Sequence, residues 1–188
     1  SVSRLNVAVR DTEHFSDATA EQYQSVLDNI ATIVKDEYVG GHAVQVNMLT
    51  DRLMLSAMNN CNAGWESLTL APDGHFYICP AFYYSGDSPV GSVADGIDIK
   101  NPQLYRLDHA PICRNCDAWH CRRCVWLNQR TTLEVNTPSH EQCVMAHTER
   151  EASRRLLASI RQHGDFLPEC TIAELDYNDP FEYVMSKN

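Results

Sequence analysis

Apolar residues in the first fifty positions follow two different periods. The stretch from Arg4 to Arg10 is dense in Val and Leu, as in a strand that is buried on both faces. Next come apolar residues at the three-and-four spacing of one helix face, namely Tyr23, Val26, Leu27, Ile30, Ile33 and Val34. Thr19 with Gln22 predicts a capping box at the start of this helix, and Gly40 and Gly41 predict its end.

A second strand is predicted from Ala43 to Leu49. A crossover as long as this helix normally makes the two strands parallel, with a right-handed connection. Residues 1–56 are therefore interpreted as one strand-helix-strand unit. Such a unit cannot shield both faces of its strands, so we expect the chain to be a piece of a longer protein.

The middle of the chain has a different pattern. The segment ESLTLAPDGHFYICPAF predicts two short strands around Asp73-Gly74, a dipeptide that favours a hairpin turn. From Ser85 to Pro111 glycines and prolines interrupt every stretch, and PQLYRL alone predicts a helical turn. We expect no ordinary hydrophobic core here, and metal ligation is the usual substitute for one.

A last long helix is predicted after Pro138. Ser139 with Gln142 forms a second capping box, and Met145, Ala152, Leu156 and Ile160 continue an apolar face to about Gln162. Cys143 falls in the first turn, where positive partial charge stabilises a thiolate. Residues 151–188 comprise the end of this helix and an acidic tail. The whole pattern predicts an α+β fold.

Net charge and hydropathy exclude two classes of partner. The formal net charge of the 188 residues is -10 at pH 7, and proteins that bind nucleic acid through phosphates present a basic face instead. No run approaches the roughly 20 apolar residues that cross a bilayer, and the first residues lack the apolar stretch of a signal peptide. We therefore predict a cytoplasmic protein, in which closely spaced cysteines bind metal more often than one another.

Seven of the eight cysteines follow a distinctive order. Cys61 is followed by twelve residues, Gly74, four residues and Cys79; two CxxC pairs separated by four residues and a lone downstream cysteine come after a gap. Seven thiols exceed one tetrahedral site and suit two four-ligand sites with one ligand missing or supplied from elsewhere. The predicted metal ligands are Cys61, Cys79, Cys113, Cys116, Cys121, Cys124 and Cys143.

This order resembles the SPASM domain, the C-terminal extension of many radical S-adenosylmethionine enzymes that modify peptides and proteins. The resemblance implies two auxiliary [4Fe-4S] clusters, bound within residues 57–150. It also implies that residues 1–56 are the end of the partial TIM barrel that precedes this domain. The segments CVWLN and TLEVNTPSHEQC are similar to the maturases that are encoded with cysteine-repeat peptides.

By the same resemblance, Cys113, Cys116, Cys121 and Cys143 would hold a distal cluster. A proximal cluster would take Cys61, Cys79 and Cys124, and its usual eighth cysteine has no match in the residues before Cys61. That absence would leave an iron open to a substrate thiolate. The four cysteines from Cys113 to Cys124, here called the quartet, have four and two residues in their second and third intervals. The family usually has five and three residues there. Pro80 stands where the sulfatase-maturing branch has an aspartate base, so that chemistry is not expected.

The motif CxxxCxxC, whose cluster cleaves S-adenosylmethionine in this family, is missing from the sequence. We therefore do not expect the chain to be catalytic alone, and S-adenosylmethionine would enter only through an upstream radical barrel. The expected substrate is a cysteine-containing peptide, which the clusters would position and supply with electrons.

Zinc is the main alternative. Four thiols between Cys113 and Cys124 could close on one zinc ion, which would make this a non-enzymatic, zinc-stabilised interaction module. Zinc could also replace clusters in an aerobic sample. Arg114, Arg122, Arg123 and Arg130 form a basic patch around the quartet, although each is expected to pair with a surface carboxylate. Cys170 is interpreted as a free thiol.

Overall fold

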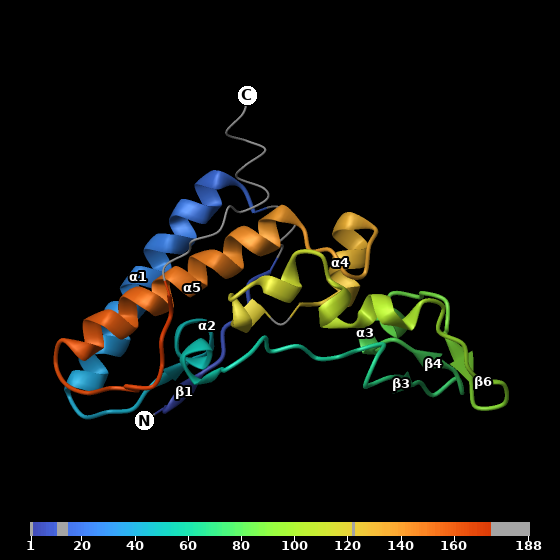
Figure 1. Ribbon diagram of the computed structural model, residues 1–188, viewed down its shortest axis with the longest axis horizontal. Helices are drawn as coiled ribbons and strands as arrows, with labels where there is room; N and C mark the ends of the chain where they lie inside the picture. The colour runs from blue at the N-terminus through green and yellow to red at the C-terminus, as the bar shows by residue number, and fades with distance from the viewer. Residues whose placement is uncertain (1, 11–14, 122, 174–188) are drawn as a thin grey trace. The chain divides into compact units, whose positions relative to one another are not determined.

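The computed structural model describes residues 2–10, 15–121 and 123–173. In this part of the chain helices combine with two-stranded sheets, so the α+β prediction is confirmed (Figure 1). The chain divides into two compact units. The first, here called the helical unit, comprises the described residues of Ser1–Leu55 and Val144–Asn188; the second, the cysteine unit, comprises Ser56–Cys143. Among the described helices none is long and apolar enough to cross a membrane.

The helical unit begins with the predicted parallel strand pair, but both strands are shorter than expected. β1 (Arg4–Leu5) pairs with β2 (Gln45–Val46) in parallel, with Arg4 opposite Gln45. The predictions of strand for the remainder of 4–10 and for 47–49 were wrong. Beyond Leu5 and Val46 the side chain of Asn47 replaces the backbone hydrogen bonds between the strands. Its amide accepts from the Val7 N–H and donates to the Val7 carbonyl, both at 2.8 Å.

After β2 the chain turns directly into helix. α2 (Asn47–Thr50) is followed by the 3₁₀ turn η2 (Asp51–Met54). Thr50 Oγ1 fixes this turn, since it accepts from the Val46 N–H at 2.9 Å and donates to the Val46 carbonyl at 3.0 Å. A hydroxyl thus replaces the next strand partner of Val46.

α1 (Asp17–Val39) connects the two strands. Its N-cap is Ser16, whose hydroxyl accepts from the Thr19 N–H at 3.3 Å, so the prediction that Thr19 caps the helix was three residues late. The predicted end is confirmed, because Gly40 is the C-cap and Gly41 has a left-handed φ of 84°.

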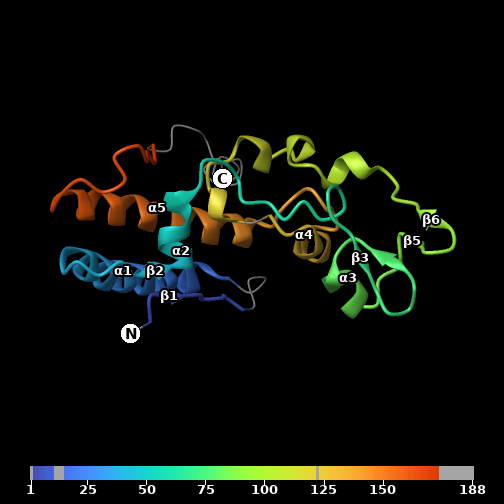
Figure 2. The ribbon, with the colours of Figure 1, turned by 90° about the horizontal axis from the view of Figure 1, so that it is seen from below.

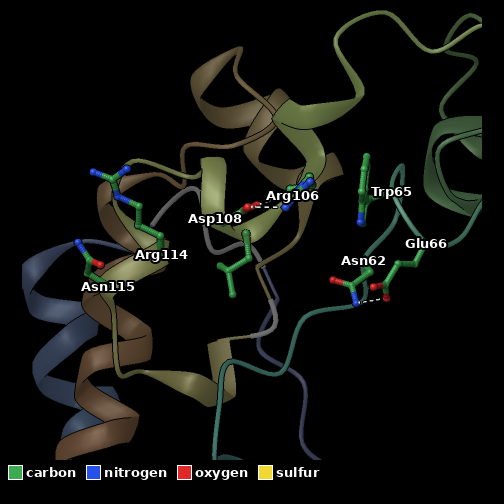
Figure 3. A pocket seen from close by; sticks show the side chains of 8 residues that line it. Asn62, Trp65, Glu66, Arg106, Asp108, Arg114 and Asn115 are labelled. Atoms are coloured by element: carbon green, nitrogen blue, oxygen red, sulfur yellow. Dashed lines mark hydrogen bonds and ion pairs between the residues drawn. The ribbon is translucent and has the colours of Figure 1, made fainter.

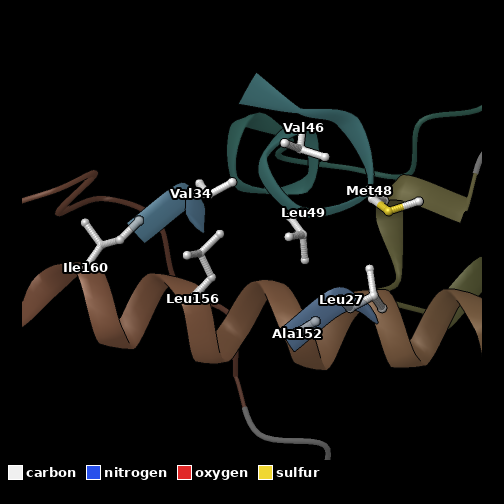
Figure 4. Packing of buried hydrophobic residues seen from close by; sticks show 8 residues of the cluster. All are labelled: Leu27, Val34, Val46, Met48, Leu49, Ala152, Leu156 and Ile160. Atoms are coloured by element: carbon white, nitrogen blue, oxygen red, sulfur yellow. The ribbon is translucent and has the colours of Figure 1, made fainter. Parts of the chain in front are cut away.

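α5 (His140–Arg161) packs against α1 in the helical unit. Its predicted start is confirmed, since Ser139 Oγ accepts from the Gln142 N–H at 3.3 Å. The side-chain donor Nε2 of Gln142 has no partner in the described part of the chain. The core between the helices and β2–α2 (Figure 4) consists of Leu27, Val34, Val46, Met48, Leu49, Ala152, Leu156 and Ile160. Of the other predicted apolar positions, Val26 and Ile33 are exposed.

The cysteine unit is built from short elements. The predicted hairpin is confirmed, with β3 (Thr69–Leu70) antiparallel to β4 (Phe76–Tyr77) around Asp73-Gly74. The short helix α3 (Pro80–Tyr84) lies beside this hairpin (Figure 2). The other described elements are β5 (Gly91–Ser92), β6 (Gly96–Ile97), α4 (Val125–Thr132) and the 3₁₀ turns η3 (Pro102–Tyr105), η4 (Leu107–His109), η5 (Cys113–Asn115) and η6 (Trp119–Cys121).

This unit has a small apolar core, so the expectation that it would lack one was wrong. The hairpin, the segment after it and the first turn of α4 supply the buried members Ala63, Ala71, Tyr77, Ile78, Phe82 and Val125. Tyr77 and Phe82 are its aromatic members, and the partly buried rings of Tyr83, Tyr105 and Trp126 pack around it. The core lies next to the cysteines, since half-buried Cys79 packs against it.

Candidate metal centre

The first CxxC pair is shaped by a 3₁₀ turn. η5 begins at Cys113, and the Cys116 N–H donates to the Cys113 carbonyl at 3.2 Å. Side chains three residues apart in a 3₁₀ turn lie one above the other, so both thiols face the same side. The Ala118 N–H donates to Cys116 Sγ at 3.3 Å. Cysteine sulfurs that bind a metal commonly accept such hydrogen bonds from the backbone.

Two other cysteines stand at helix starts. Cys79 follows β4 and is the N-cap of α3, and Cys124 is the N-cap of α4. Cys143 lies in the first turn of α5, as predicted, and its N–H donates to the Ser139 carbonyl. The sequence reasoning anticipated only this last placement, because the two shorter helices were not recognised.

Electrostatic coupling separates six of the thiols into two groups. Burial raises the pKa of Cys113 to about 12, and the neighbouring thiols of Cys121 and Cys116 add to the rise while Arg123 opposes it. Desolvation also raises the pKa of Cys124; the N–H groups of Leu127 and Trp126 oppose this rise, and the thiols of Cys79 and Cys61 add to it. We call Cys113, Cys116 and Cys121 the first triad, and Cys61, Cys79 and Cys124 the second triad.

The triads cut across the two CxxC pairs. Cys124 is three residues from Cys121 in sequence, yet the thiols that shift its pKa come from the hairpin region. Cys143 is not among the groups that shift the pKa of Cys113 in the described structure. Within residues 2–10, 15–121 and 123–173, no three or more His, Cys, Asp or Glu side chains are gathered as a metal-binding group. The electrostatic coupling therefore divides the thiols into two groups, although no metal-binding group is formed among the described residues.

Arg123 is a buried cation of the cysteine unit. Its side chain is 1% exposed, and its guanidinium donates to the carbonyls of Tyr105 at 3.0 Å and of Leu104 and Arg106 at 3.4 Å. Burial lowers the pKa of Arg123, whereas the thiols of Cys113, Cys61 and Cys121 raise it. The guanidinium is therefore electrostatically coupled to members of both triads.

This buried cation has no carboxylate partner among the described residues, and its Nε donor has no acceptor there. An unpaired buried charge costs several kcal/mol, on the order of 3–5 when a partner is removed. Thiolates bound to metal would supply the missing negative charge, since a cluster held by four thiolates is anionic. The chemistry of the donor set and the orphaned Nε thus fit an anionic metal cofactor.

The other members of the predicted basic patch lie elsewhere. Arg130 pairs with Asp87 at 2.6 Å on the surface, as expected. Arg123 does not fit the expectation of a surface ion pair, because it is buried against carbonyls. Arg114 is exposed at a pocket, and Arg122 lies outside the described residues. Cys170 belongs to the helical unit, where it packs half-buried near Leu53, Leu157 and Ile172.

Sequence reasoning missed two residues beside the cysteines. Trp65 carries the Arg106 guanidinium over its ring, 4.6 Å from the centroid. Gly64 has a φ of 83°, and a Cβ there would lie 2.4 Å from the Tyr105 ring. The available signal was the Asn-Ala-Gly-Trp segment directly after Cys61, which is typical of a tight turn.

A scan against protein-family models found no match for this chain, and a search of curated proteins found none either.

Proposed function

We propose that the cysteine unit binds two iron-sulfur clusters, as the C-terminal region of a radical S-adenosylmethionine enzyme that modifies a cysteine-containing peptide. One observation carries the proposal: six thiols fall into two electrostatically coupled triads, and a buried arginine that lacks a carboxylate partner in the described chain is coupled to members of both. The triads agree with the ligand sets that the SPASM resemblance implies, with Cys143 completing the first set.

Each residue has a distinct role in this proposal. Cys113, Cys116, Cys121 and Cys143 would hold one [4Fe-4S] cluster, and Cys61, Cys79 and Cys124 the other. Bound clusters supply one-electron transfer, and an iron with three protein ligands can accept a substrate thiolate. Arg123 would offset the negative charge of both sites and orient the 104–106 backbone through its three carbonyl bonds.

The remainder of the enzyme is part of the same proposal. The parallel β1–α1–β2 arrangement is compatible with the last strand-helix-strand of a partial barrel. Generation of the radical is assigned to an upstream barrel, because the chain has no CxxxCxxC motif. A cytoplasmic setting would keep the thiols reduced.

The zinc alternative needs all four thiols of the quartet around one ion. The electrostatic neighbours of Cys124 argue against that arrangement, because they are Cys79 and Cys61. The two proposals therefore differ in which cysteines act together.

Anaerobic reconstitution with iron and sulfide tests the proposal. We expect a brown protein that holds up to about eight irons per chain when both clusters assemble. Cys116→Ala should lower the iron and sulfide content by about half, and Cys79→Ala should remove the other half, with Mössbauer spectra showing which cluster is lost. A colourless protein that binds one zinc through the quartet, indifferent to Cys79→Ala, would contradict it.

Arg123 provides a test that changes no ligand. We expect Arg123→Met to lower the iron retained by both sites, because the anionic clusters lose their buried counter-charge. Arg130→Met is the matched control, since its arginine pairs with Asp87 at the surface. Equal iron content in the two variants would show that Arg123 does not stabilise the clusters.

A further inference from the structure

A hollow of about 180 Å³ opens in the helical unit at the ends of its two long helices. Its lining comes from residues 38–39 of α1, Ile160 of α5 and residues 163–166 after α5. Both helices end on the same side of this unit (Figure 1, Figure 2). Sites for small molecules usually measure about 300–1,000 Å³. This hollow therefore accommodates one side chain or a group of similar size and not a whole cofactor.

Two aromatic rings line the hollow, those of Tyr38 and Phe166. The rings are half-buried and meet edge to face, with their centroids 4.7 Å apart. Both pack against the apolar core of the helical unit, which fixes their positions. Burial raises the pKa of Tyr38, so its phenol stays neutral at physiological pH. The faces of neutral aromatic rings carry partial negative charge and attract cations.

The segment that carries Asp165 and Phe166 is held in place by Arg161. The Arg161 guanidinium donates to the carbonyls of Phe166 at 2.9 Å, of Cys170 at 2.7 Å and of Leu167. This cation is therefore used by the backbone, and it is not part of the lining. A wall that is fixed before a ligand arrives reduces the entropy lost on binding.

The charges around the hollow favour a positively charged ligand. α1 has no basic residue in its last turn, so nothing in that turn offsets the partial negative charge of the helix end. The two acidic residues of the turn pair with Lys35 and His42. The exposed Asp165 carboxylate lines the hollow beside the His163 ring, and it forms no hydrogen bond or ion pair with a described residue. Asp165 and the end of α1 are therefore available to a cation.

Most of the charged groups of the larger hollow in the cysteine unit bind one another (Figure 3). That hollow measures about 530 Å³. Arg106 donates to the Asp108 carboxylate at 2.9 and 2.5 Å, and the Asn62 amide donates to Glu66 at 2.5 Å. A charged ligand there would compete with these bonds, whereas a cation at Asp165 displaces no described protein group.

We propose that the hollow of the helical unit binds an alkylammonium group of about the size of a lysine side chain. The ammonium would donate to the Asp165 carboxylate beside the two aromatic rings, and its methylene stem would pack on Val39 and Ile160. The net charge of -10 attracts cations to the chain. The site lies in the helical unit and uses no cysteine, so the inference goes beyond the proposed function and does not depend on it.

Titration of the isotope-labelled, reconstituted protein, followed by nuclear magnetic resonance, tests the inference. The probe is acetyl-Gly-Lys-Gly-amide, and the same peptide with norleucine in place of Lys is its uncharged control. We expect saturable shifts of the backbone amides of 38–39 and 160–166, with a dissociation constant on the order of 1–10 mM for one small contact. The norleucine peptide should bind at least about fivefold more weakly, because it keeps the methylene stem and lacks the charge.

n-Butylammonium chloride distinguishes two sources of the same chemical group. An affinity equal to that of the lysine peptide would show that a free amine is sufficient. Weaker binding than that of the peptide would assign the hollow to a lysine side chain of a partner protein.

Asp165→Asn should weaken binding of the lysine peptide about two- to fivefold, as for one exposed ion pair, and leave the norleucine peptide unaffected. Glu21→Gln is the matched control, because this exposed carboxylate lies about 25 Å from Tyr38 along α1. Equal affinity for the two peptides, or an Asp165→Asn variant that binds the lysine peptide as the unchanged protein does, would overturn the inference. Iron and sulfide content of the same samples reports on the clusters, so failure of this site can be told from failure of the proposed function.

Discussion

The helical unit and the cysteine unit differ in how they bury their apolar side chains. In the helical unit two long helices, α1 and α5, bury an aliphatic core with the short β2–α2 segment. The cysteine unit has a comparable length of chain but mainly two- to five-residue elements, a smaller core surrounded by aromatic rings, and seven thiols. The first gains its stability from apolar area, whereas we expect the second to need its metal.

This contrast also explains where the chemistry lies. Each unit uses an arginine to bind three backbone carbonyls, and in the helical unit this is the exposed Arg161, which donates to the carbonyls of Phe166, Leu167 and Cys170. In the cysteine unit it is the buried Arg123. A fold with so many irregular turns places polar groups inside, and there a buried charge or a metal can be held.

The largest expected effect comes from removal of the metal. Removal of the metal from the reconstituted protein with a chelator should unfold the cysteine unit. The free energy of metal binding, about 10 kcal/mol or more for structural sites, contributes directly to the free energy of folding there. Hydrogen exchange followed by mass spectrometry should show amides of 57–143 losing protection by at least about tenfold, while α1 and the later turns of α5 keep theirs. An equal loss of protection in both units would show that they do not differ in their dependence on metal.

Next in size is a cavity in the helical unit. Leu156 is 2% exposed in the core, and Leu156→Ala should lower the free energy of unfolding by about 2–5 kcal/mol. Denaturant unfolding monitored by circular dichroism measures the change. Ile33→Ala on α1 is the control, because that side chain is 62% exposed and its loss should cost little. Iron content should stay unchanged in both variants, and a matching loss of iron would show that the units are not independent.

A smaller effect is expected at the turn beside Cys61. Gly64→Ala combines a left-handed φ with a Cβ that would lie 2.4 Å from the Tyr105 ring, and should destabilise the cysteine unit by about 1–3 kcal/mol. Gly74→Ala shares the left-handed φ but meets nothing within 4 Å, so it isolates the backbone cost. Thermal unfolding of the reconstituted variants should rank Gly64→Ala as the less stable, and the reverse order would refute the close packing on Tyr105.

The smallest effect concerns a surface pair of the helical unit. Partial burial alone would raise the pKa of Asp28, but hydrogen bonds from Arg155 and Gln24 bring it below its ordinary value. A lowered pKa stabilises the fold above the unfolded-state pKa of about 3.9, and this contribution is lost as pH falls through the folded-state pKa. Arg155→Gln should therefore cost about 0.2–1 kcal/mol at pH 7. Unfolding measured against pH should show the difference fading in acid, whereas a constant difference would exclude the linkage.

Local signals in the sequence determined the elements whose causes lie within a few residues. Asp73-Gly74 set the hairpin turn, Ser139 set the start of α5, and Gly40 with Gly41 set the end of α1, because turns and caps are made by neighbouring backbone groups. The cysteine spacing likewise indicated metal chemistry before any fold was known. It could not show which thiols become neighbours.

Tertiary structure alone decided the features that depend on distant partners. Asn47 ended its strand because its amide reached Val7, forty residues earlier. Arg123 is buried because carbonyls of the 104–106 segment surround it, although its sequence neighbours suggested an exposed basic patch. The thiols that shift the pKa of Cys124 are those of Cys79 and Cys61, which are distant in sequence. Hydrogen bonds and electrostatic coupling depend on distances in space. The spacing of residues along the chain therefore predicts them only between residues that are close in sequence.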